Sequence, residues 1–436
     1  MLEIIQNPAV VIGWLLCLTV LLLAGLGGLL LLRRHRLLSL QFEAENRLLE
    51  EQVRSIQEKR KLEIETSEAW NGFANFVVVK KVCHGDSGIC SFYLKPKDKR
   101  LVLTPFLPGQ HLIFQLPIGS QPIKRRYSLS DCSNGEYYRV SVKHALAPKN
   151  RPDAPAGVGS SYFHEMLEEE SQSPYKCLIQ VACPAGSFVL DPAETRPLVL
   201  IGGGVGVTPM LSMFNSILEK SESREVWFFY GIRNAEESVL FDEGMLHPSF
   251  EKEAGQRENI HVFVYYSAVK TKEELSAIQV PPGVGRCGGR ITLDAIKSHL
   301  DSNNYLFYIC GPDAMMNDLE EGLVAWGVPE EDVLTERFAP PSTKAVKHTD
   351  GAPRKITFAK SGKEVEFTAD DSTILEVAER AGVPIAYDCR AGSCGTCKVG
   401  LVSGKVEEAF RTNYKCSPGS CLSCACLPDT DIVLDC

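Results

Sequence analysis

The chain has 436 residues, of which 46 are Lys or Arg and 55 are Asp or Glu, and its formal net charge is −9. With 44% hydrophobic residues it is not a mostly disordered chain, and its length predicts about three domains of ~100–200 residues each. The acidic balance argues against a nucleic-acid partner, and 16 cysteines in so long a chain do not make a small disulfide scaffold.

The first segment, residues 1–36, has the pattern of a membrane anchor. Residues 9–32 carry no charged side chain, and an apolar helix of this length can cross a bilayer. Arg33, Arg34 and Arg36 follow, and an excess of Lys and Arg marks the cytoplasmic side. We therefore predict a single-pass transmembrane helix in the membrane bilayer with cytoplasmic catalytic domains. The alternative, a cleaved signal peptide, would need a shorter apolar run.

Residues 37–69 are predicted to form a helical stalk, because they are rich in Glu, Gln, Arg and Leu and lack Gly and Pro over residues 37–66. Phe42, Leu49 and Val53 fall roughly on one helical face, but Glu45 and Gln52 interrupt it. The interrupted face favours a solvated stalk. A dimerising stalk, which would make the chain a homodimer, is the alternative.

The next motif lies within residues 121–131. Arg125, Tyr127 and Ser128 form an Arg-x-Tyr-Ser pattern on a predicted strand. Further along, Gly157 and Ser160 belong to a glycine turn that opens a predicted helix. Such a turn can cradle a pyrophosphate through its backbone N–H groups and the helix dipole.

Together these residues resemble the FAD-binding barrel of the ferredoxin–NADP reductase superfamily, of the flavohemoglobin and phenylacetyl-CoA-oxygenase-reductase type. The resemblance implies an antiparallel β-barrel over residues 70–195. It also implies that Arg125 contacts the FAD diphosphate and that Gly157 and Ser160 hold phosphate. Tyr127 and Ser128 would line the isoalloxazine ring, and Val142 would lie near the flavin or its ribityl chain. Arg126 occupies the variable position of the motif and is interpreted as a surface charge.

An apolar run from Leu198 leads into a glycine-rich turn and a helical segment, which is the start of a nucleotide-binding α/β unit. Val207 stands where the G-x-G-x-x-G pattern requires its third glycine, so an ordinary Rossmann dehydrogenase is the wrong template. The sequence reads Gly-Gly-x-Gly-x-Thr-Pro instead, and it is followed by Cys310-Gly-Pro and by Glu336-Arg-Phe. These motifs resemble the same reductase superfamily.

This resemblance implies an α/β domain with a parallel sheet, which binds NAD(P), over residues 196–338. Its catalytic candidates are Cys310, Thr208 and Phe338: the first two would flank the nicotinamide, and Phe338 would cover the flavin until the nicotinamide displaces it. The implied nucleotide-binding residues are Gly202, Gly203, Gly204, Gly206, Thr208, Gly311, Pro312 and Phe338. NADH is favoured over NADPH, since Glu236 and Glu237 closely follow Arg233.

Residues 339–354 show no apolar periodicity and are predicted to be a linker. As a flexible tether it would let the last domain move between the flavin and a partner.

Residues 355–436 contain the most specific motif of the chain. Cys389, Cys394 and Cys397 have the C-x4-C-x2-C spacing of a plant-type [2Fe–2S] cluster, whereas a zinc ribbon would need two C-x2-C pairs. The cluster requires a fourth thiolate, and spacing alone leaves four candidates: Cys416, Cys421, Cys424 and Cys426.

The same segment resembles plant-type ferredoxins, whose last ligand stands in a Leu-x-Cys sequence with proline four residues later. Leu422, Cys424 and Pro428 match that pattern. The resemblance therefore implies Cys424 as the fourth ligand and an α+β β-grasp fold.

Nicotinamide gives up two electrons together, whereas a [2Fe–2S] cluster accepts them one at a time. A carrier that can hold a one-electron intermediate must therefore stand between them, and a flavin can do so. We expect a multidomain, membrane-anchored enzyme that passes electrons from NAD(P)H to FAD, to the [2Fe–2S] cluster and then to a separate acceptor protein, such as an oxygenase, a desaturase or a hybrid-cluster protein. Two alternatives are a membrane NADH–quinone reductase related to the sodium-pumping type, whose modules occur in the opposite order, and a redox-sensing binding module.

Overall fold

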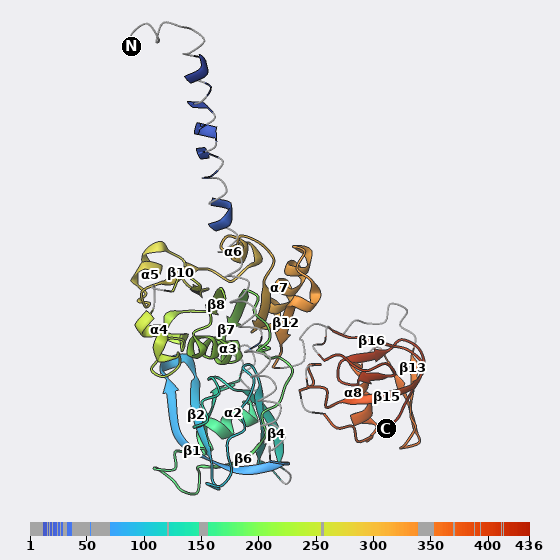
Figure 1. The fold of residues 1–436 in the computed structure, drawn as a ribbon. Coiled ribbons are helices and arrows are strands. Elements are labelled where there is room, and N and C mark those ends of the chain that lie inside the picture. Colours follow the sequence, from blue (N-terminus) through green and yellow to red (C-terminus); the bar gives the residue numbers. More distant parts are fainter. Residues whose placement is uncertain are drawn as a thin grey trace, which may run out of the picture. The chain divides into compact units, whose positions relative to one another are not determined.

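The computed structural model describes residues 70–119, 122–147, 156–253, 257–338, 353–368, 371–387, 389–392, 394–410, 412 and 414–436, with scattered residues between 12 and 53 (Figure 1). The chain divides into two compact units. The first comprises residues 1–61 and 192–195, and the second comprises residues 62–191 and 196–436. The predicted linker lies almost entirely outside the described residues.

In the first unit, the described residues between 12 and 36 are helical and exposed. None of the helices formed by the described part of the chain is both long enough and apolar enough to cross a membrane. This finding contradicts the prediction of a single-pass membrane protein with cytoplasmic catalytic domains. The predicted stalk, residues 37–69, lies outside the described residues apart from Val53.

The second unit begins with an antiparallel sheet of six strands in the order β4-β3-β6-β1-β2-β5. The strands are β1 (Phe73–His84), β2 (Ile89–Pro96), β3 (His111–Leu116), β4 (Ile123–Ser128), β5 (Tyr138–Lys143) and β6 (Leu178–Ala182). A 3-10 turn, η1 (Gly85–Ser87), joins β1 to β2, and α2 (Val158–Ser161) runs directly into the π-helical turn η2 (Tyr162–Met166). Phe92, Phe114 and Phe163 pack edge to face inside this sheet and fix the position of η2.

A parallel sheet follows, with the strand order β10-β9-β8-β7-β11-β12. Its strands are β7 (Leu198–Gly203), β8 (Val226–Ile232), β9 (Ile260–Tyr266), β10 (Val284–Gly288), β11 (Leu306–Cys310) and β12 (Val333–Glu336). Its helices are α3 (Val207–Lys220), α4 (Pro248–Glu253), α5 (Lys272–Ala277), α6 (Leu293–Lys297) and α7 (Asp313–Ala325), with 3-10 turns η3 (Gly204–Gly206), η4 (Ala235–Glu237) and η5 (Glu330–Asp332).

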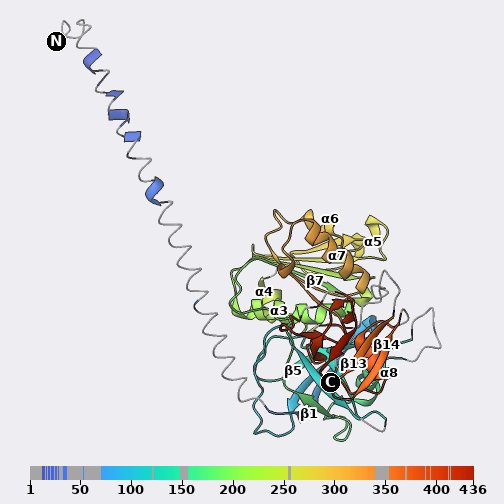
Figure 2. The ribbon, with the colours of Figure 1, turned by 90° about the vertical axis from the view of Figure 1, so that its right-hand side faces the viewer.

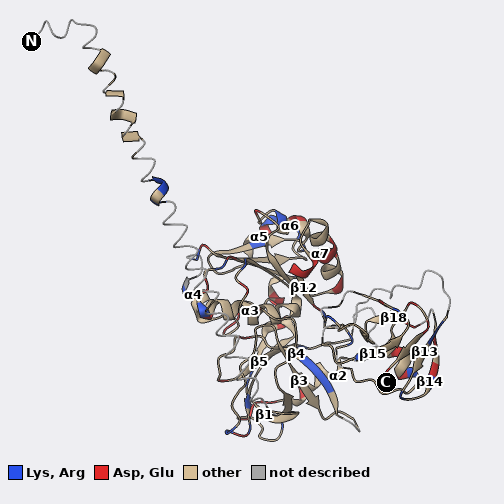
Figure 3. Cartoon of the chain, turned by 45° about the vertical axis from the view of Figure 1, so that its right-hand side comes forward, with Lys and Arg blue, Asp and Glu red and all other residues tan. Residues whose placement is uncertain are grey.

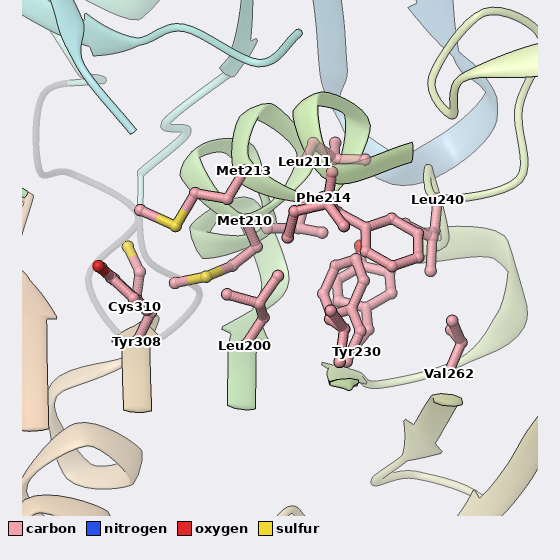
Figure 4. Packing of buried hydrophobic residues seen from close by; sticks show 14 of the residues in the cluster. Leu200, Met210, Leu211, Met213, Phe214, Tyr230, Leu240, Val262, Tyr308 and Cys310 are labelled. Atoms are coloured by element: carbon pink, nitrogen blue, oxygen red, sulfur yellow. The ribbon is translucent and has the colours of Figure 1, made fainter. Parts of the chain in front are cut away.

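Helices cover both faces of this sheet, and Figures 1 and 2 show α3 and α7 on opposite sides of β7. Leu198 and Leu200 point into the core under α3, whereas Val199 and Ile201 belong to the core under α7. Figure 4 shows the first of these cores, with Met210 and Met213 of α3 packed beside Leu200. A strand buried on both faces explains the continuous apolar run that begins at Leu198.

A network of buried polar groups joins the antiparallel sheet to the parallel one. Arg139 of β5 is 1% exposed, and its guanidinium donates to the backbone carbonyls of Gly244 and Met245. From α3, the Asn215 side chain donates to Asp131 Oδ1 at 2.9 Å. These bonds fix the first sheet against the second, so the sites at their junction have a defined geometry.

The last part of the second unit has an α+β fold. Its five-stranded sheet has the order β14-β13-β19-β15-β17, and β16 pairs with β18 beside it. The elements are β13 (Arg354–Phe358), β14 (Lys363–Phe367), α8 (Ile374–Arg380), β15 (Lys398–Ser403), β16 (Val406–Glu408), β17 (Ser420–Leu422), β18 (Cys426–Pro428) and β19 (Ile432–Leu434). The Thr373 side chain accepts the backbone N–H of Glu376 and so caps α8.

Candidate functional site

The Arg-x-Tyr-Ser motif lies on β4, where successive side chains point to opposite faces. An ideal Cβ added to Gly159 of α2 would lie 2.8 Å from Arg125 Cγ and 3.0 Å from the Tyr127 hydroxyl. Arg125 and Tyr127 therefore lie directly against the glycine turn that was predicted to hold phosphate. Ser128 points the other way, and its hydroxyl donates to Glu336 Oε2 at 3.1 Å.

The predicted phosphate turn begins at Gly157, immediately before α2. The Ser160 hydroxyl donates to the Gly157 carbonyl at 2.9 Å and accepts the backbone N–H of Ala145 at 3.1 Å. Ser160 thus shapes the turn through its backbone contacts. Val142 is buried in β5, on the strand that leads toward this turn.

A cavity of about 650 Å³ opens beside β4. It is lined by His111, Pro122, Ile123, Lys124, Arg125, Arg126, Ser128, Glu336, Arg337, Phe338, Tyr387, Cys389 and Arg390. Figure 3 shows the positive stretch of β4. Arg125 faces the glycine turn, and its guanidinium suits the diphosphate of a dinucleotide. Arg126, interpreted from the sequence as a surface charge, is half buried and lines this cavity, because its register on β4 matches that of Ser128.

The cavity also holds a carboxyl group to which the sequence analysis gave no role. Glu336, at the end of β12, is 6% exposed, and its Oε1 lies 3.9 Å from His111 Nδ1. Burial raises the pKa of Glu336 to about 7, against the opposing effects of Arg126 and the Ser128 hydrogen bond. Burial likewise lowers the pKa of His111 to about 3, with Arg126 adding to the effect. Glu336 can therefore hold or release a proton near neutral pH.

The glycine-rich turn after β7 lies against the turn after β11. An ideal Cβ at Gly206 would stand 2.2 Å from the Cys310 carbonyl oxygen, and one at Gly203 would stand 2.7 Å from Pro312 Cδ. The structure thus brings together, at the carboxyl ends of β7 and β11, most of the residues predicted to bind the nucleotide: Gly202, Gly203, Gly204, Gly206, Gly311 and Pro312. Ligands of open α/β sheets bind at such an edge.

The three catalytic candidates differ in their exposure. Cys310 is fully buried, and burial raises the pKa of its thiol, with Glu336 adding to the effect. Thr208 is 2% exposed, and its hydroxyl donates to the Val205 carbonyl at 3.0 Å. Phe338 is 50% exposed and lines the cavity. Of the three, only Phe338 has an exposed side chain, as a ring that stacks on the flavin would need.

The predicted cluster ligands lie on the loop before β15 and on the turn between β17 and β18. The thiols of Cys397 and Cys424 are in hydrogen-bond contact with each other, and this contact lowers the pKa of Cys397 below its usual value. Backbone N–H groups of Ala391 and Thr396 lie 3.3 Å from Cys389 Sγ and 3.5 Å from Cys394 Sγ.

Backbone N–H groups aimed at sulfur favour the thiolate form that a cluster needs, so this donor set fits a [2Fe–2S] group. Within the described ranges, no three His, Cys, Asp or Glu side chains stand close enough together to hold a single metal ion. Cys421 and Cys426 form a second thiol pair within the core of the domain.

Comparisons with known proteins agree with this arrangement. A family of oxidoreductase NAD-binding domains matches residues 200–321, and a family of 2Fe-2S iron-sulfur cluster binding domains matches residues 356–429. The flavohemoprotein of Halalkalibacterium halodurans is 34% identical over 295 residues, which are 66% of this chain and 66% of that protein. The flavohemoprotein of Rhodopirellula baltica is 35% identical and covers 62% of each chain. The chain therefore spans slightly less than two thirds of the length of these relatives.

Two solved structures share the fold over 84% of this chain. CYP116B46 of Tepidiphilus thermophilus is 25% identical with a TM-score of 0.53, and 42% of its chain is covered. A type IV self-sufficient cytochrome P450 monooxygenase is 20% identical with a TM-score of 0.59, and 41% of its chain is covered. The cofactors of the present chain are FAD, NAD and a [2Fe–2S] cluster.

Proposed function

We propose that this oxidoreductase, which joins an FAD- and NAD-binding module of the ferredoxin-reductase type to a [2Fe–2S] domain, passes electrons from NADH to a separate acceptor protein. The observation that carries the proposal is that one chain contains both a nicotinamide-binding domain and a [2Fe–2S] domain. A single cavity lined by Arg125, Ser128 and Cys389 supports it further, because it joins residues predicted for the flavin to one predicted for the cluster.

NADH delivers two electrons as a hydride, and a [2Fe–2S] cluster accepts one. FAD, when bound, exchanges electrons both in pairs and singly. The task of the protein is to align the nicotinamide with the flavin and to keep water away. In this proposal the flavin part spans residues 70–195, the nicotinamide part 196–338 and the cluster part 355–436.

On the flavin side, Arg125 would bind the diphosphate, and the turn from Gly157 to Ser160 would present its backbone N–H groups to it. Tyr127, Ser128 and Val142 would lie along the flavin. Glu336 would orient Ser128 within the cavity by accepting its hydroxyl at 3.1 Å.

On the nicotinamide side, the glycine turn after β7 would hold the phosphates. The buried Cys310 would pack against the nicotinamide, while Thr208 would keep the turn in shape through its bond to Val205. Phe338 would leave the flavin face when the nicotinamide enters. The cluster would be held by Cys389, Cys394, Cys397 and Cys424.

An oxygenase is the first acceptor to test, since the fold is shared with part of a self-sufficient monooxygenase. The function itself can be tested with cytochrome c, a protein that accepts single electrons. We expect the purified holoprotein to reduce cytochrome c with a higher kcat/KM for NADH than for NADPH, because Glu236 and Glu237 repel a 2′-phosphate. A holoprotein whose flavin is bleached by NADH but which reduces no protein acceptor would contradict the proposal.

A further inference from the structure

A disulfide joins the first two strands of the antiparallel sheet. Cys83 of β1 and Cys90 of β2 stand directly opposite each other in the register of the hairpin, and their sulfurs are bonded. The two ends of the bond differ in access: Cys83 is exposed, whereas Cys90 is 4% exposed. A thiolate arriving from solution therefore meets the sulfur of Cys83, and Cys90 is the leaving group.

His164 of η2 stands behind the buried sulfur. Its Nδ1 lies 3.5 Å from Cys90 Sγ, and its Nε2 donates to the Val142 carbonyl at 2.8 Å. Because Nε2 carries the hydrogen, Nδ1 of the neutral ring directs its lone pair at the sulfur. Burial lowers the pKa of His164, so the neutral ring prevails at neutral pH.

The groups around His164 fix its ring. The ring of His144 stacks on it with the centroids 4.7 Å apart, and Lys81 Nζ donates to the His164 carbonyl at 2.8 Å. Burial is the largest effect that disfavours the charged form of His164, and the charge of Lys81 adds to it, whereas the hydrogen bond to Val142 and the nearby Glu165 favour that form. The imidazole is thus held as a base at one fixed position beside Cys90.

We propose that the Cys83–Cys90 disulfide is a thiol–disulfide exchange site for small thiols of the glutathione class, with His164 as the acid–base group for Cys90. In the first step the thiolate attacks Cys83 Sγ, a new S–S bond forms there, and the Cys83–Cys90 bond breaks. The electron pair of the broken bond goes to Cys90 Sγ, and the proton that the small thiol released on becoming a thiolate reaches this sulfur through Nδ1 of His164. A second thiolate then releases Cys83, so that two thiols become one disulfide while the protein disulfide becomes two thiols.

The reverse direction uses the neutral ring. Nδ1 of His164 accepts the proton of the Cys90 thiol, and the resulting thiolate attacks Cys83 Sγ. The Cys83–Cys90 bond forms again, the small molecule leaves as its thiolate, and it takes up the proton released from His164. A buried thiol beside an oriented base is the arrangement that makes this resolving step fast. The chemistry needs neither FAD nor the cluster, so its test is independent of the proposed electron transfer.

The direction of attack is tested on the wild-type holoprotein. The protein is incubated with reduced glutathione, quenched in acid, alkylated with N-ethylmaleimide and mapped by peptide mass spectrometry. We expect glutathione on Cys83 and the maleimide on Cys90. Glutathione on Cys90, or a disulfide that stays intact under conditions that reduce exposed protein disulfides, would overturn the proposal.

The role of the imidazole is tested with His164→Gln, whose amide can still donate to the Val142 carbonyl. We expect the exchange rate at neutral pH to fall by about a hundredfold, the usual size of an acid–base contribution. His261→Gln, which removes a half-buried histidine stacked on Trp227 of the other sheet, is the matched control and should react like the wild type. An unchanged rate in His164→Gln would show that the ring takes no part, and the mapping of the wild type decides the site even if this variant folds poorly.

Discussion

Burial and neighbouring polar groups have opposite effects on the pKa of Glu336. The carboxyl lies within the protein, yet Arg126 and the Ser128 hydroxyl favour its ionised form. Burial has the larger effect, so the pKa rises from 4.5 to about 7. A carboxylic acid with this pKa has a consequence for stability that can be measured without any substrate.

In the folded protein Glu336 keeps its proton up to about pH 7, whereas in the unfolded chain it loses it near 4.5. Folding therefore binds a proton between these values, and the free energy of unfolding falls as the pH rises from 4.5 to 7, by up to about 3 kcal/mol. Glu336→Gln removes this contribution. We expect the difference between the Tm of the wild type and the Tm of Glu336→Gln to decrease as the pH rises from 4.5 to 7. Glu273→Gln, an exposed control, should show no such trend, and parallel Tm curves for the wild type and Glu336→Gln would contradict the assignment.

The identity of the fourth cluster ligand can be tested by single substitutions. The thiol of Cys424 is in hydrogen-bond contact with that of Cys397, whereas Cys421 belongs to a separate thiol pair with Cys426. We expect Cys424→Ser to lose most of its iron and acid-labile sulfide, because serine replaces a soft thiolate ligand. Cys421→Ser, equally buried and three residues away, should keep both. Iron analysis and visible absorption measure the difference, and the opposite pattern would move the ligand to Cys421.

Single residues were predictable where the chemistry is local in the sequence. Cys389, Cys394 and Cys397 are predicted as cluster ligands from their spacing alone, and Cys424 only through the resemblance to ferredoxins; these four assignments stay predictions. Glu336 could not be assigned a role, because its partner Ser128 is 208 positions away and no pattern links them. Arg126 was interpreted as a surface charge, and its place in the cavity lining could not be foreseen, because strand register rather than the motif decides it.

At the scale of elements, the site depends on two turns that touch. The turn after β7 approaches the turn after β11 so closely that Gly206 has no room for a side chain, with the Cys310 carbonyl 2.2 Å from an ideal Cβ. The strands themselves follow from apolar runs such as that from Leu198, and this was predicted. Their order in the sheet was not, because β7 pairs with β8 and β11, which lie far apart in the chain.

Gly206→Ala tests this contact. Overpacking of this kind costs about 1–3 kcal/mol, and because the displaced turn is the predicted phosphate site we expect kcat/KM for NADH to fall at least about tenfold. Gly288→Ala, at the exposed end of β10, is the control, since its Cβ would meet only Leu275 at 4.0 Å. Steady-state kinetics with NADH distinguish the two. Equal kinetics in both variants would mean that the turn does not bind the nucleotide.

The whole molecule combines modules that handle electrons in different numbers. Its division into an antiparallel sheet, a parallel sheet and an α+β domain was predicted correctly, because each module carries its own motif. The membrane placement was wrong: apolar composition over residues 9–32 indicated a span, but no helix among the described residues meets the length and hydropathy that a span requires.

The central claim is that electrons leave this protein through its [2Fe–2S] domain. The most direct measurement is stopped-flow mixing of NADH with the holoprotein and with Cys394→Ser, followed at the flavin band and by reduction of cytochrome c. We predict that NADH bleaches the flavin equally fast in both proteins, while cytochrome c reduction is lost only in the variant. Full cytochrome c reduction by a variant that holds no iron would contradict the claim.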